Sequence, residues 1–168
     1  MVEAWLSGPI PGVTPLLQPV AHGLLNARQQ VEEALAGLSP EQLVARPGDV
    51  ASIAYHVTHA IGSLDRLFTY ARGEGLSDSQ RDALKIESSV ESRPQNAEDL
   101  AEEFARAVDR AMAQVRETGD DVLLEFRGVG RARLPSTVLG LLFHGAEHSV
   151  RHAGQIVTTA KLVRSLLN

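Results

Sequence analysis

Residues 136–166 constrain the fold of this chain more strongly than any other segment. At helical spacing, their apolar side chains cover most of the helix circumference. They include Val138, Leu139, Leu142, Phe143, Ala146, Val150, Ile156, Val157 and Ala160. A helix that is apolar nearly all round has to be buried by neighbours on more than one side. The segment therefore predicts a long helix packed among other helices.

Three earlier segments also carry apolar residues at steps of three and four, which is typical of amphipathic helices. They span about 16–38, about 50–72 and about 96–119. Asp49 and Asn96 are candidate caps for the second and third of these helices. We expect Gly73 to stop the second helix, because glycine commonly follows a helix C-terminus.

The connections differ in character. Ser39-Pro40-Glu41-Gln42 has the serine, proline and glutamine of a short helix start. The polar stretch 74–94 predicts a long connection with a short helix near Gln80–Ile86, and 121–134 predicts an extended arm or short hairpin.

Four long helices with one long connection between the second and third predict an all-α fold, an antiparallel four-helix bundle. A chain of 168 residues suits a single domain over 1–168.

Histidines are concentrated in two places. The sequence LLFHGAEHSVRHAGQI places His144, His148 and His152 at intervals of four, and His56 and His59 lie in the second predicted helix. Side chains four apart share one face of a helix. Imidazole is the commonest protein ligand for the later divalent transition metals. The pattern predicts a metal site if the two clusters meet in space.

A catalytic zinc-type site uses three protein ligands and leaves one position for water or substrate. His148 and His152 would supply two of the ligands, and His56 or His59 the third. At 100° per residue, His56 lies nearer than His59 to the apolar face of the second helix, so periodicity favours His56. His22 stands apart from both clusters, and we expect it to be an ordinary hydrogen-bonded residue.

Composition narrows the chemistry further. The chain has no cysteine, which excludes disulfides, thiolate ligands and a cysteine nucleophile. A net charge of −5 argues against nucleic-acid binding, and there is no basic amphipathic helix for a membrane surface. The N-terminus does not resemble a signal peptide, and no apolar run is long enough to span a membrane. We therefore expect a cytoplasmic protein.

The stretches HSVRHAGQI and SIAYHVTHAIGSLDRLF resemble the last and second helices of the DinB-like family of metal-binding four-helix bundles. LSPEQLVARPG is also similar, and the resemblance covers most of the chain. It implies a metal triad of His59, His148 and His152, with His59 seven residues after Ser52. In this family the position of His144 is often histidine but is not usually a ligand.

Two positions depart from the family pattern: Ala51 stands where tryptophan is common, and Ala153 where arginine often follows the last histidine. Neither departure removes a ligand. For the third ligand we follow the resemblance and predict His59 over His56. His56, His144 and Gln155 are then predicted either to support a ligand or to replace one.

Three neutral imidazoles leave a divalent ion with its full charge, so the ion can lower the pKa of bound water toward ~7 or deprotonate a bound thiol. The resemblance implies a transferase or isomerase acting on a small-molecule substrate with a low-molecular-weight thiol such as bacillithiol or mycothiol. For such an enzyme we expect bound Zn, Ni, Fe or Mn. The alternatives are a metal-free dimerisation or ligand-binding module, and a metallohydrolase using the same site. The apolar last helix predicts a homodimer. No general base stands out.

Overall fold

A computed structural model describes residues 3–87, 89 and 96–167, and this part of the chain is mostly helical. Its α-helices are α1 (Gln18–Leu35), α2 (Pro40–Val44), α3 (Ile53–Ala71), α4 (Asp78–Ile86), α5 (Ala97–Glu117) and α6 (Val138–Leu166). Two short strands, β1 (Phe126–Val129) and β2 (Leu134–Thr137), form a small antiparallel sheet. The predicted all-α class is therefore confirmed, with a hairpin added to it.

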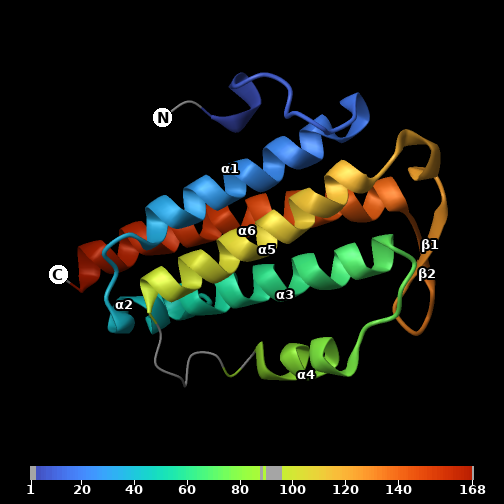
Figure 1. The fold of residues 1–168 in the computed structure, drawn as a ribbon. Coiled ribbons are helices and arrows are strands. Elements are labelled where there is room, and N and C mark those ends of the chain that lie inside the picture. Colours follow the sequence, from blue (N-terminus) through green and yellow to red (C-terminus); the bar gives the residue numbers. More distant parts are fainter. Residues whose placement is uncertain (1–2, 88, 90–95, 168) are drawn as a thin grey trace.

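Four long helices, α1, α3, α5 and α6, lie side by side (Figure 1). Both α1 and α3 pack against α5 and against α6. Their facing sides bury one continuous set of apolar side chains, among them Leu24, Phe104, Leu142 and Ile156. As its apolar circumference predicts, α6 has neighbours on more than one side.

The helix that carries His56 and His59 begins later than its sequence pattern suggests. Ser52, and not Asp49, caps α3: its hydroxyl accepts a hydrogen bond from the backbone N–H of Tyr55. Asp49 ends a 3₁₀ turn and has a positive φ of 61°. The predicted caps elsewhere are correct, since Asn96 caps α5 and the Ser39 capping box opens α2.

The connection between α3 and α5 contains α4, which lies alongside α3 (Figure 1). The amide of Gln80 donates hydrogen bonds to side chains of Asp65 and Thr69 on α3, which fastens α4 there. Residue 88 and residues 90–95 of this connection lie outside the described residues. The attachment of α4 places Glu87, which immediately follows it, over α3.

The hairpin leads directly into α6. Its register pairs Phe126 with Thr137 and Val129 with Leu134, and Thr137 then caps α6 through a hydrogen bond from the Gly140 N–H. The sequence predicted an arm or hairpin at 121–134, and the observed strands lie slightly later. Among the described helices, none is both long and apolar enough to cross a membrane.

Close packing of α3 on α6 brings their histidine-bearing faces together. At Gly145 on α6, an added Cβ atom would lie 2.8 Å from Cε2 of Phe68 and 3.2 Å from Cδ1 of Leu64. Separations this short leave no room for a side chain. The glycine therefore lets the α6 backbone approach α3 one turn before His148.

Candidate metal centre

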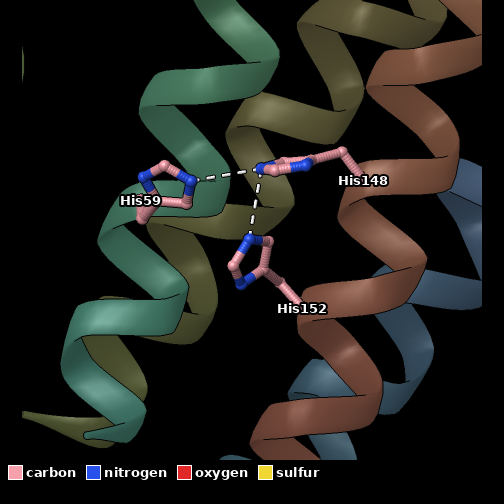
Figure 2. Close-up of side chains that lie close together, drawn as sticks. All are labelled: His59, His148 and His152. Atoms are coloured by element: carbon pink, nitrogen blue, oxygen red, sulfur yellow. Dashed lines mark hydrogen bonds between the residues drawn. The ribbon is translucent and has the colours of Figure 1, made fainter. Parts of the chain in front are cut away.

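Three imidazole rings meet between α3 and α6 (Figure 2). Nε2 of His148 lies 3.1 Å from Nε2 of His59 and 3.1 Å from Nε2 of His152. One nitrogen from each ring can be chosen so that all three lie within 4.8 Å of one another. The histidine clusters that are far apart in sequence therefore do meet in space, and they meet through the three residues that the family resemblance implies.

Helix geometry explains the convergence. His148 and His152 stand one turn apart on the α6 face that packs against α3. His59 lies at the edge of the buried face of α3, with its side chain 24% exposed, whereas His152 is only 8% exposed. A site between two helices can use the edge of an apolar stripe, which periodicity alone does not anticipate.

The two α6 imidazoles are held neutral. Burial is the main cause that lowers the pKa of His148 to about 4 and the pKa of His152 to about 3, and the neighbouring histidines lower both further. Neutral imidazole is the form that coordinates a metal ion. At neutral pH these two ligands therefore need not lose a proton before binding.

Hydrogen bonds alone satisfy this arrangement poorly. A ring nitrogen carries either one hydrogen or one lone pair, yet Nε2 of His148 faces two other nitrogens at 3.1 Å. Nitrogens bound to one tetrahedral zinc at 2.0–2.1 Å would be about 3.3 Å apart. The two separations from Nε2 of His148, each 3.1 Å, are close to this value, and all three nitrogens lie within 4.8 Å of one another. The donor set therefore fits a divalent ion of the zinc type.

The outer nitrogens of the three rings have different surroundings. Nδ1 of His59 lies 3.0 Å from a carboxylate oxygen of Glu87, and Nδ1 of His152 lies 3.1 Å from Nδ1 of His56. Nδ1 of His148 is buried without a hydrogen-bond partner among the described residues. His56 therefore lies behind the candidate ligand His152 and contributes no nitrogen to the three-ring group.

Other predicted site residues lie outside the group. The side chain of His144 is half exposed, its Nδ1 is 3.3 Å from Glu147, and it contributes no nitrogen to the group. Gln155 is exposed, and the described residues show no hydrogen bond from it to the rings. His22 bonds to the Gly8 carbonyl at 3.0 Å, as an ordinary hydrogen-bonded histidine would.

Sequence reasoning missed three residues around His59. Glu87 accepts a hydrogen bond from the ring, Arg66 pairs with Glu87, and the ring of Tyr55 is stacked on His59 with centroids 5.7 Å apart. Glu87 comes from the polar connection, where no periodic pattern marks it as buried. Tyr55 and Arg66 lie one turn before and two turns after His59, so a search for polar or aromatic residues at helical spacing around it could have found them.

The fold and the three-histidine group together define a helical protein with a candidate metal centre between two helices. The family model of the DinB superfamily matches residues 24–156 of this sequence. The chain therefore belongs to the DinB superfamily, and the expected family membership is confirmed. A search of curated proteins found no significant match.

Two solved structures share the fold. A conserved protein from Enterococcus faecalis superposes with a TM-score of 0.72 at 18% identity, over 89% of this chain and 97% of its own. A protein from Streptococcus pneumoniae superposes with a TM-score of 0.63 at 10% identity, over 89% of this chain and 90% of its own. At these identities the likeness concerns the fold alone.

Proposed function

We propose that this protein is a metal-dependent enzyme in which His59, His148 and His152 bind one divalent ion, with Zn, Ni, Fe and Mn as candidates. The observation that carries the proposal is the meeting of three ring nitrogens within 4.8 Å. Two of these rings are kept neutral by burial, which is the protonation state that ligation requires. An ion held there would have a position open for a substrate atom.

We propose further that the substrate atom is the sulfur of a low-molecular-weight thiol and that the reaction is a group transfer or isomerisation. A divalent ion bound there would favour loss of the proton from a coordinated thiol, so that the sulfur would be a thiolate at neutral pH. The absence of cysteine from the chain agrees with a thiol that arrives from outside. The residues of this chain then serve to hold the site: the three imidazoles orient the ion, and the packed helices keep their spacing fixed.

We extend the proposal to the arrangement of the helices, the location of the protein and its oligomeric state. We place the four long helices in an antiparallel bundle of one domain and the protein in the cytoplasm as a homodimer. Phe143 on α6 is 55% exposed and lines a hollow of about 330 Å³ together with Pro19 and Gly23 on α1. Light scattering that gives the mass of two chains supports the dimer, and the mass of one chain refutes it.

Elemental analysis of protein purified without chelator tests the metal site. We expect about one divalent ion per chain in the wild type and a large loss of metal from His148→Ala. His22→Ala is the matched control, because His22 is a histidine bonded to the Gly8 carbonyl and is not a member of the three-ring group. A metal-free wild type whose melting temperature is unchanged by EDTA would favour a binding module without metal instead.

The reaction class has its own test. Consumption of bacillithiol or mycothiol with an electrophilic acceptor, by the wild type and not by His148→Ala, supports the transferase. Hydrolysis of simple esters or phosphates that needs the same residues but no added thiol would instead support a metallohydrolase.

A further inference from the structure

The carboxylate of Glu87 is buried against α3, beside the outer nitrogen of His59. Only 6% of Glu87 is exposed, and its Oε2 lies 3.0 Å from Nδ1 of His59. Its other oxygen accepts a hydrogen bond from Nη1 of Arg66. Buried carboxylates are costly unless they are paired and hydrogen-bonded, so a carboxylate with both oxygens engaged in this way is a built feature.

Glycine at position 62 makes room for this carboxylate. An added Cβ atom on Gly62 would collide with Oε1 of Glu87 and lie 2.7 Å from Nη1 of Arg66. Gly62 lies three residues after His59 on α3, where glycine costs helix stability. The bare backbone at this position is therefore what allows Glu87 and Arg66 to meet above the helix.

We propose that Glu87 is a positioning residue for the metal ligand His59. As an acceptor-only carboxylate it holds the hydrogen of His59 on Nδ1, so that the lone pair of Nε2 points toward His148 and His152. Arg66 fixes the carboxylate, and Gly62 leaves space for the pair. This inference rests on the proposed metal site and adds residues to it that touch no ion themselves.

A second carboxylate, that of Glu147, has similar partners but lies outside the three-ring group. Glu147 also joins a histidine Nδ1 to an arginine, since it contacts His144 and Arg151. That carboxylate is 40% exposed, and its histidine contributes nothing to the three-ring group. Glu147 therefore offers a control that removes a similar charge close to the site without breaking a hydrogen bond to any of the three rings.

The test is the affinity for Zn²⁺, measured by competition with a chromophoric chelator. We expect Glu87→Ala to weaken binding by about 10- to 100-fold, which is the usual effect of losing the partner behind a ligand. Glu87→Gln keeps an oxygen that can accept from His59, and we expect it to recover part of the loss. Glu147→Ala should bind as the wild type does. A merely structural role for Glu87 would not produce the partial rescue by glutamine.

The substitution Gly62→Ala provides a second test of the proposal, and it changes neither a metal ligand nor a charged residue. The added methyl group should displace the ends of two flexible side chains, while alanine favours the helix, so the variant is expected to fold and to lose Zn²⁺ affinity. Gly154→Ala is the matched control, because a Cβ atom there meets nothing within 4 Å. In the metal-free wild type, ¹⁵N spectra should show His59 with its hydrogen on Nδ1, and Gly62→Ala should lose this preference.

The outcomes separate the two proposals. Suppose that the wild type binds Zn²⁺ and that Glu87→Ala and Gly62→Ala bind it with affinities within about threefold of the wild type, a change well below the expected loss. This result would overturn the role of Glu87 and leave the metal site standing. A wild type that binds no zinc would overturn the metal site and this inference together.

Discussion

At the scale of single residues, the site depends on which nitrogen of each ring carries a hydrogen. The pKa of His148, about 4, and that of His152, about 3, lie below the ordinary histidine value of 6.5. As pH falls below about 6.5, these two histidines are protonated in the unfolded chain but stay neutral in the folded protein. The free energy of unfolding of the metal-free protein should therefore be highest above pH 6.5 and decline as pH falls toward 4.

Urea unfolding of metal-free protein between pH 7.5 and about 5 measures this decline, in a window above most carboxylate titration. In the double variant His148→Gln/His152→Gln, the free energy of unfolding should depend less steeply on pH, because the glutamine side chain does not titrate. Equal slopes for the wild type and the double variant would contradict the assigned protonation states.

The choice between His56 and His59 shows what could be predicted at this scale. Periodicity favours His56 because it lies nearer the apolar face, and the structure does bury it, but behind His152. The resemblance to known sequences selected His59, which the structure brings to the other two rings. Glu87 was beyond prediction, since its burial depends on where α4 docks and on the missing side chain of Gly62.

At the scale of helices, the spacing of α3 and α6 depends on Gly145. In Gly145→Ala, overpacking against Phe68 and Leu64 should cost about 1–3 kcal/mol, and alanine should return ~1 kcal/mol of helix stability. We therefore expect a net destabilisation of up to about 2 kcal/mol. Gly154→Ala, which meets nothing, should be neutral or stabilising by up to ~1 kcal/mol. Urea unfolding measures both, and an equal gain from both substitutions would refute the close approach.

The helices themselves were largely predictable, because long apolar periodicity and local capping residues act within one segment. The predicted second helix of about 50–72 is observed as Ile53–Ala71, and Asn96 caps the third as expected. The error at Asp49 has a local cause: the turn at Pro47–Asp49 gives this residue a positive φ, and the chain enters the helix only at Ser52. The docking of α4 on α3 depends on tertiary contacts that no periodicity encodes.

At the scale of the whole molecule, a bound ion would link parts of the chain that are far apart. His59 and His148 are separated by 89 positions, and they lie on two helices of the core. A ligand that binds only the folded state stabilises it by about 2.7 kcal/mol at 100 times its dissociation constant. Zn²⁺ should therefore raise the melting temperature of the wild type and leave that of His148→Ala unchanged. Equal shifts in both would point to binding elsewhere.

X-ray absorption at the zinc edge, on protein loaded with one equivalent of Zn²⁺, shows whether His59, His148 and His152 bind one ion together. We expect a shell containing three imidazole nitrogens at about 2.0–2.1 Å. His59→Ala should lose one of these imidazoles, and His22→Ala should lose none. A shell of oxygen atoms alone, or an imidazole count that is the same in His59→Ala as in the wild type, would contradict this expectation.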